Sequence, residues 1–427
     1  MQELNEKRLK RQVIGKTHRF LAISPLGFET SLANEFKYIR RAPTQHEQEP
    51  DSLSIGIPGD GRVEFTSKIT DAWKFVAYSR IANRILMHIA DFKAENFRDF
   101  EKKSAEIPWE LYLASTNVSI HVNCKHSRLY HSDAIAERLQ KVMELEPAPN
   151  LIRGNTPQHL FVNFLDDRCT IWLDLAGEEL YKRGHERFVN DAPLKETIAA
   201  GMLREAFDLN PGTPVTLFDL MAGSGTFSLE AAYITNKLIP GTCRDFSLKH
   251  QPAFKEATWN FILKQSSEAP NIRIVTSDIS ERAVEIIRHN VECSPLASIA
   301  PAPIVPELKD FFNYSAQDIA DACQGGTSPV IVLNPPYGKR LDFDAPKLYT
   351  HIGRRLAELA RPLKNLGKPL TIAILAPKDD SRPGSKYTCT TNLLRECPDL
   401  SPTHNPEAKQ IITSHGGLTL NVFIASL

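Results

Sequence analysis

Four short apolar runs in the second half of the sequence constrain the fold more than any other feature. They cover residues 215–220, 272–277, 330–333 and 370–375, and stretches with helical periodicity separate them. Strands that alternate with helices in this way build a parallel sheet with helices on both faces. The sequence therefore predicts an α/β fold with a doubly wound sheet, whose ligand site lies at the carboxyl ends of the strands.

The third run ends in an amide, two prolines and an aromatic ring: Asn334, Pro335, Pro336 and Tyr337. The amino group of a nucleobase is a poor nucleophile, because its lone pair is delocalised, and it needs acceptors for its protons. The Asn334 side-chain oxygen and the Pro335 carbonyl can accept them, while Tyr337 stacks on the ring. We predict that this tetrapeptide is the catalytic loop for a planar amine. An ordinary Pro-rich turn is the alternative.

A glycine-rich turn follows the first run and leads into a helical stretch. Glycines allow close backbone approach, and a helix N-terminus favours the anionic end of a nucleotide-like cofactor. The turn lacks the spacing of a dinucleotide fingerprint and of a P-loop, and a plain strand-to-helix connection is the alternative reading. The predicted cofactor-binding residues here are Asp219, Ala222, Gly223, Ser224, Gly225 and Thr226.

Two further acidic residues fit the same pocket. Asp278 stands at the end of the second run, where a carboxylate can bind ribose hydroxyls of a cofactor lying over the glycine turn. Asp310 precedes Phe311 and Phe312 and is placed to meet an adenine amino group, with an aromatic ring for stacking. Taken singly, each is more typical of a helix cap or a solvated loop. Their order along the chain, with Asn334 as the last contact, predicts one cofactor site.

This order of motifs resembles class I S-adenosylmethionine-dependent methyltransferases. The segment from Tyr181 to Arg187, followed by residues 192–200, looks like the junction in bacterial 23S ribosomal RNA guanine-N2 methyltransferases of the RlmL type. The resemblance runs from about Thr17 to Leu427. Where that family usually has Pro-Met-Cys-Gly-Ser-Gly-Thr, this chain has Leu-Met-Ala-Gly-Ser-Gly-Thr at residues 220–226, which keeps both glycines.

The resemblance implies an activity and its partners. The cofactor would be S-adenosyl-L-methionine, and the reaction would be methylation of the exocyclic N2 of a guanine in 23S ribosomal RNA, before the large subunit is fully assembled. Neither a metal nor a membrane would take part. A transfer-RNA guanine-N2 methyltransferase is the closest alternative, and a non-catalytic RNA-binding assembly protein with a methyltransferase fold is another.

The predicted domain organisation has three parts. Residues 1–18 would be a basic N-terminal tail, residues 19–185 an α+β RNA-binding module resembling a THUMP domain with its ferredoxin-like partner, and residues 186–427 the methyltransferase domain. Within the module, we expect a helix over 71–87, a strand over 118–122 and a hairpin turning at Asp166 and Asp167. His126, Arg128, Tyr130 and His131 are candidate RNA contacts.

The composition agrees with a cytoplasmic enzyme, but the absence of net charge is unusual for a protein that binds RNA. Seven scattered cysteines without a Cys-x-x-Cys pair favour a reducing compartment and argue against a zinc site. Fifty-one basic and fifty-one acidic residues give no net charge, so an RNA-binding surface requires segregated charges. The basic clusters near the motifs are Lys182, Arg183, His185 and Arg187; Lys339 and Arg340; Arg354 and Arg355; and Lys378, Arg382 and Lys386.

Overall fold

The computed structural model describes residues 2–41, 53–114, 118–143, 157–189, 193–264, 270–336, 344–380 and 388–427. The chain forms two compact units. The first comprises Met1–Ser24, Ala33–Gly184 and Gly241–Ser267, and the second comprises Pro25–Leu32, His185–Pro240 and Glu268–Leu427. The domain boundary predicted between residues 185 and 186 lies beside the point where the chain passes from the first unit to the second, between Gly184 and His185. Two segments depart from this division: residues 25–32 belong to the second unit, and residues 241–267 belong to the first.

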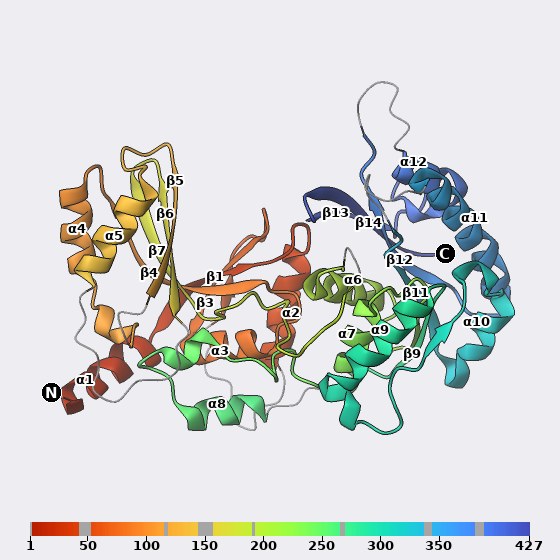
Figure 1. Ribbon diagram of the computed structural model, residues 1–427, viewed down its shortest axis with the longest axis horizontal. Helices are drawn as coiled ribbons and strands as arrows, with labels where there is room; N and C mark the ends of the chain where they lie inside the picture. The colour runs from red at the N-terminus through yellow and green to blue at the C-terminus, as the bar shows by residue number, and fades with distance from the viewer. Residues whose placement is uncertain are drawn as a thin grey trace. The chain divides into compact units, whose positions relative to one another are not determined.

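The first unit is built on a seven-stranded sheet of order β2-β3-β1-β4-β7-β6-β5 (Figure 1). Only the pairing of β5 with β6 is parallel among the described strand pairs of this sheet. The strands are β1 (Thr17–Ile23), β2 (Ser54–Ile55), β3 (Arg62–Lys68), β4 (Arg84–Lys93), β5 (Val118–Lys125), β6 (Gln158–Leu165) and β7 (Arg168–Asp174). The helices are α1 (Gln2–Leu9), α2 (Glu29–Arg41), α3 (Ile69–Tyr78), α4 (Phe97–Ala105), α5 (Ser132–Val142) and α8 (Glu256–Leu263).

The described part of the basic segment 1–18 is folded: α1 continues into a π-helix at Lys10–Ile14, Val13 is buried, and an ion pair joins Arg8 to Glu110 at 2.7 Å. One expectation for this unit is wrong. The helix expected over 71–87 ends at Tyr78. Residues from Arg84 onward form β4, which lies between β1 and β7, so pairing on both edges overrides the local helical pattern.

The second unit has the predicted doubly wound sheet, of order β10-β9-β8-β11-β12-β14-β13. Neighbouring strands from β10 to β12 are parallel, and β14 pairs antiparallel with both β12 and β13. The strands are β8 (Val215–Asp219), β9 (Ile272–Asp278), β10 (Pro306–Leu308), β11 (Ser328–Leu333), β12 (Thr371–Pro377), β13 (Lys409–His415) and β14 (Leu418–Ser426). The helices are α6 (Glu196–Asp208), α7 (Thr226–Thr235), α9 (Glu281–Glu292), α10 (Ala316–Ala322), α11 (Ala345–Asn365) and α12 (Cys389–Glu396).

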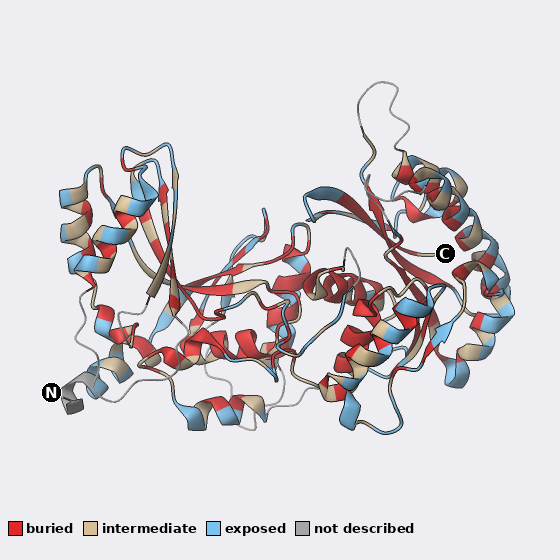
Figure 2. Cartoon of the chain, in the orientation of Figure 1, coloured by how far each residue is buried: buried red, intermediate tan, exposed pale blue. Residues whose placement is uncertain are grey.

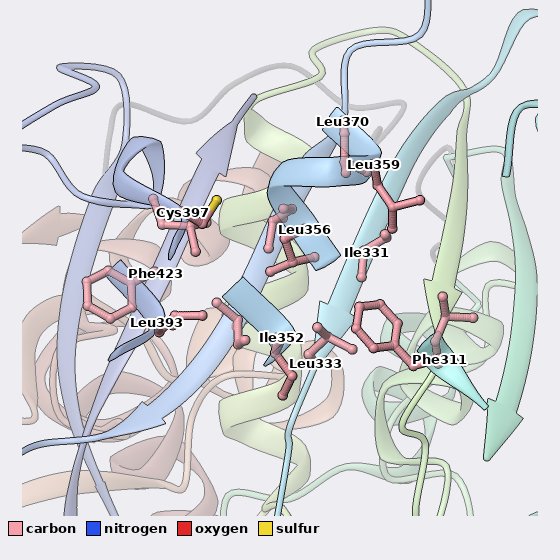
Figure 3. Packing of buried hydrophobic residues seen from close by; sticks show 14 of the residues in the cluster. Phe311, Ile331, Leu333, Ile352, Leu356, Leu359, Leu370, Leu393, Cys397 and Phe423 are labelled. Atoms are coloured by element: carbon pink, nitrogen blue, oxygen red, sulfur yellow. The ribbon is translucent and has the colours of Figure 1, made fainter. Parts of the chain in front are cut away.

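Helices cover both faces of this sheet. In Figure 1, α6, α7 and α9 lie on one side, and α10, α11 and α12 lie on the other. Figure 2 shows the amphipathic character of α11, which is buried along one side and exposed along the other. Its Ile352, Leu356 and Leu359 pack with Ile331 and Leu333 of β11 in the main core (Figure 3). This packing fixes β11 and therefore the position of Asn334 directly after it.

Segment 25–32 supplies part of the second unit's core from the beginning of the chain. Phe28 is fully buried, and its ring lies so close to Gly201 of α6 that a Cβ at that position would be 2.5 Å from a ring carbon. Ser31 Oγ donates a hydrogen bond to Oε1 of Glu205, whose other oxygen accepts one from Lys409. The second unit is thus assembled from distant parts of the sequence. Among the described helices, none is long and apolar enough to cross a membrane.

Candidate active site

The predicted site residues come together at the carboxyl edge of the second unit's sheet. Asp219, the last residue of β8, is the register partner of Thr276 in β9 and of Val332 in β11. Leu308 of β10 pairs with Asp278 of β9. Because these strands are parallel, the loops that carry Asp278, Asp310 and Asn334 all leave the same edge as the glycine turn.

The glycine turn after β8 has the backbone that only glycine adopts readily. Gly223 has a φ of 56° and Gly225 a φ of 78°, both in the left-handed region. Gly225 is the residue before the first turn of α7, and its N–H donates to the Ala222 carbonyl at 2.7 Å. Among the described residues, no atom lies within 4 Å of the position that a Cβ would take on Gly223. The turn therefore offers open backbone beside a helix N-terminus.

Asp278 fixes this turn to the next strand. Its Oδ2 accepts the Gly223 N–H at 2.8 Å, and its Oδ1 accepts the Ser280 N–H at 2.9 Å. Each carboxylate oxygen has a second lone pair, so the group can still accept ribose hydroxyls. Ile279, the next residue, is 70% exposed. The sequence analysis did not name this exposed apolar side chain, which follows Asp278 directly at the carboxyl edge of the sheet.

Asp310 caps a short helix, which is one of the alternative roles that the sequence allowed for it. Its Oδ1 accepts the Phe312 N–H at 3.0 Å and caps the short 3₁₀-helix Phe311–Asn313. Lys309 N–H donates to the Asp278 carbonyl at 3.1 Å, which extends the β9–β10 contact up to this cap. The structure therefore holds Asp310 close to Asp278 along the edge of the sheet.

The Asn334 side chain presents a buried acceptor that no donor among the described residues reaches. Its Oδ1 is buried, yet it has no hydrogen-bond partner among the residues that the structure describes. Leaving a buried amide oxygen unsatisfied costs roughly 1–3 kcal/mol. Pro335 is buried and Pro336 is exposed. Tyr337, the fourth residue of the predicted catalytic loop, lies outside the described residues.

Asp219 is buried at the end of β8, directly before the glycine turn in the sequence. It is 1% exposed, and its Oδ2 accepts hydrogen bonds from the Ser228 N–H at 3.1 Å and from Ser228 Oγ at 2.7 Å. Burial, with a smaller contribution from the nearby Asp278, raises the pKa of the Asp219 carboxyl to about 7, against the lowering effect of the Ser228 hydrogen bonds. Asp219 thus stabilises the first turn of α7 through its hydrogen bonds with Ser228.

Arg187 is a site residue whose position the sequence did not predict. It forms an ion pair with Glu196 and donates to Ser224 Oγ at 3.2 Å and to Thr226 Oγ1. Its side chain is largely buried. The partners of Arg187 belong to the glycine turn and to α6, which local sequence patterns do not bring together. This arginine therefore positions the turn and is not a surface contact for phosphate.

The other basic clusters are also largely engaged. Arg183 is buried and donates to the carbonyls of Leu180 and Arg80. Arg354 pairs with Glu396, and Arg355 pairs with Glu358. Lys339, Arg340, Arg382 and Lys386 lie outside the described residues. Arg183 and Arg187 of the junction cluster are therefore engaged within the fold, whereas Lys182 is exposed and pairs with Glu178 at the surface.

Residues 183–366 match the family model described as "RMKL-like, methyltransferase domain". This segment is similar to RMKL-like methyltransferase domains. The glycine turn, Asp278, Asp310 and Asn334 all lie inside the matched segment, and the description of this family model agrees with the resemblance found in the sequence.

The curated relatives that this chain matches are longer than the chain itself. A protein of Psychromonas ingrahamii named ribosomal RNA large subunit methyltransferase K/L is 29% identical over 315 residues, which cover 69% of this chain and 40% of that protein. A protein of the same name from Syntrophotalea carbinolica is 27% identical over 79% of this chain and 47% of its own length. The chain thus spans less than half of these relatives.

A solved structure shares the architecture of the whole chain. A putative methyltransferase crystallised in complex with SAH has a TM-score of 0.71 at 22% identity, with 96% of this chain and 98% of that chain covered. The class I methyltransferase fold expected from the sequence is confirmed, together with an N-terminal α+β module.

Proposed function

We propose that the chain methylates the exocyclic N2 of a guanine in 23S ribosomal RNA, using S-adenosyl-L-methionine. The observation that carries this proposal is the buried Asn334 Oδ1, which lacks a donor among the described residues at the end of β11. An amine hydrogen of the substrate would satisfy it. A buried polar atom without a partner calls for an explanation, and a substrate amine bound at this edge of the sheet would supply one.

The cofactor fits the neighbouring loops. The open backbone at Gly223 and the N-terminus of α7 suit the charged end of S-adenosyl-L-methionine. Asp278 would bind the ribose, Asp310 would meet the adenine amino group, and Ile279 offers an apolar contact for the adenine ring. SAH in the related structure supports this choice of cofactor. The bound cofactor supplies an electrophilic methyl group.

The residues of this chain then act by alignment. Asn334 Oδ1 and the Pro335 carbonyl would accept the two amine hydrogens and draw the nitrogen toward tetrahedral geometry. Tyr337 would stack on the guanine, which must be unstacked from the RNA before its amino group can be reached in line. As the N–C bond formed and the S–C bond broke, the positive charge would pass from the sulfonium to the amine nitrogen, and it would leave with one amine proton to water. The site would therefore mainly need correct placement of the amine.

The choice of ribosomal RNA rests on the names of the relatives, and two alternatives remain to be separated. A transfer-RNA guanine-N2 methyltransferase would have the same site. A related solved structure described as a predicted N6-adenine-specific DNA methylase, with a TM-score of 0.68 at 20% identity, makes an adenine amine a second candidate. The first unit, which we propose to be a THUMP-containing RNA-binding module, would select the substrate.

Transfer of labelled methyl groups tests the proposal. Protein-free 23S ribosomal RNA, assembled large subunits, transfer RNA and double-stranded DNA are offered separately, and the nucleosides are identified after digestion. We expect N2-methylguanosine in the protein-free 23S ribosomal RNA and little product in assembled subunits. N6-methyladenosine would reject the substrate assignment, and product only in transfer RNA would favour the alternative. Calorimetry that detects no binding of S-adenosyl-L-methionine would favour a non-catalytic protein.

A further inference from the structure

Three side chains of types that bind metal ions lie close together in the second unit. Glu186, His289 and Cys293 each offer one ligand atom, and these atoms all lie within 4.8 Å of one another. His289 and Cys293 are four residues apart on α9, so they share one face of the helix. Glu186 comes from the segment that precedes Arg187. The cluster therefore joins residues that are distant in the sequence.

The surrounding contacts hold the three ligands in place. Phe188 stacks on the His289 ring, with the centroids 4.0 Å apart and the planes 6° from parallel. Asn290 fixes the backbone of Phe188 on both sides: its Oδ1 accepts the Phe188 N–H at 2.8 Å, and its Nδ2 donates to the Phe188 carbonyl at 2.9 Å. The loop that carries Glu186 is thus fixed against α9 independently of any ion.

The spacing of the ligand atoms suits a small tetrahedral ion. Cys293 Sγ lies 3.4 Å from His289 Nε2. A tetrahedral zinc ion, with Zn–S near 2.3 Å and Zn–N near 2.05 Å, separates a thiolate and an imidazole ligand by about 3.6 Å. A thiolate, an imidazole and a carboxylate are ligands that zinc prefers, whereas magnesium and calcium prefer oxygen alone.

We infer that Glu186, His289 and Cys293 bind a divalent ion of the zinc class, with a water molecule in the fourth position. The site differs from the predicted pocket for the amine, and the expectation of no metal from the scattered cysteines would then be wrong. The sequence indicates only two of the three ligands, through the His-x-x-x-Cys spacing of His289 and Cys293 on one helix face. Glu186 is 103 residues away from His289 in the chain, so no local pattern indicates it.

The ion would tie the junction segment to α9. Asn290, which lies between the two helical ligands, also donates to the Ser224 carbonyl of the glycine turn at 3.1 Å. An ion bound at Glu186, His289 and Cys293 would therefore stabilise the segment that positions this turn. The ion would stabilise the fold and take no part in methyl transfer, since the proposed chemistry at Asn334 needs no Lewis acid.

Metal binding to the full-length chain tests the inference without an activity assay. After removal of metals with a chelator under reducing conditions, the protein is titrated with Co²⁺ and with Zn²⁺. We expect one equivalent to bind, a thiolate-to-cobalt charge-transfer band, and a rise in melting temperature with Zn²⁺. Cys293→Ser should remove the band, whereas Cys243→Ser, which changes an exposed cysteine of the first unit, should retain it.

A second variant tests metal binding at an exposed position, where a substitution is not expected to unfold the protein. Glu186 is exposed, so Glu186→Gln should leave the fold intact and weaken Zn²⁺ binding by roughly tenfold or more, as the loss of groups around zinc sites does. Absence of stoichiometric binding, or a cobalt band that survives in Cys293→Ser, would overturn the inference. So would unchanged Zn²⁺ affinity in a folded Glu186→Gln variant.

Discussion

The backbone N–H of Gly223 donates a hydrogen bond of 2.8 Å to Oδ2 of Asp278, which joins the turn after β8 to the end of β9. The same carboxylate holds the Ser280 N–H at the start of α9. One side chain thus organises two adjacent loops. The residue proposed to bind the ribose also keeps the glycine turn in place, and its removal affects both.

Asp278→Ala should therefore weaken binding of S-adenosyl-L-methionine by at least tenfold. A charge-assisted hydrogen bond to the ribose is worth about 1.5–3 kcal/mol, and the loss of the Gly223 contact adds to the effect. Isothermal titration calorimetry measures the change, with Asp321→Ala on the exposed side of α10 as a control. Equal affinity in wild type and Asp278→Ala would remove Asp278 from the site.

Asn334→Ala should separate chemistry from cofactor binding. The variant removes an acceptor that is used while the amine changes geometry, so turnover should fall by roughly 10²-fold or more while cofactor affinity stays nearly constant. Single-turnover methyl transfer and calorimetry on the same preparation give the two values. An Asn334→Ala enzyme with normal turnover would contradict the proposed role of the orphaned oxygen.

Gly225→Ala should disturb the turn through both its backbone and its neighbour. A non-glycine residue at a φ of 78° costs about 1–2 kcal/mol, and the new Cβ would lie 3.1 Å from Cγ1 of Ile287. Gly212→Ala is the matched control, because its φ is 70° and no described atom lies within 4 Å of its Cβ position. We expect both variants to lose stability and only Gly225→Ala to lose cofactor affinity.

The stability of the second unit should depend on pH through Asp219. Between the ordinary pKa of 3.8 and the raised value of about 7, the folded state holds a proton that the unfolded chain releases. Stability from this group is therefore present at low pH and is lost as pH rises toward 7, by up to about 1.4 kcal/mol per pH unit. Urea unfolding followed by circular dichroism should show a smaller decline between pH 5 and 7 in Asp219→Asn. A steeper decline in the variant would reject this assignment.

Phe28→Ala should destabilise the second unit, although Phe28 is far from that unit's other residues in the sequence. Its fully buried ring packs on Gly201, and truncation of a buried phenylalanine costs roughly 3–5 kcal/mol. Phe261→Ala, which changes a side chain that is 60% exposed, should have little effect. Hydrogen exchange of α6 would locate the loss. Normal protection of α6 in Phe28→Ala would show that segment 25–32 is dispensable for this unit.

The parts of the fold that depend on local chemistry were predictable. Asp166 and Asp167, with φ values of 49° and 64°, form the tight turn expected between β6 and β7. The parallel strands and the glycine turn were also predicted, because each has a short-range pattern. The helix expected over 71–87 failed because β4 is fixed by its partners β1 and β7.

Long-range partners explain what the sequence analysis missed in the site. Arg187 resembles a phosphate contact in a basic run, but Glu196, Ser224 and Thr226 surround it in the structure. The unsatisfied state of Asn334 Oδ1 likewise depends on which atoms approach it, and no local motif reports that. Residue type identified the candidates, whereas only the packing showed which of them are engaged.

The position of β14 makes the order of synthesis matter for this protein. β14 lies between β12 and β13 in the sheet, although it is made after both. Until residue 426 has left the ribosome, one edge of β12 exposes unpaired backbone groups, which invite aggregation with other nascent chains. Phe28, from a segment that precedes the rest of the second unit in the chain, also packs in this unit. The sheet of the second unit therefore stays incomplete until the β14 segment has emerged.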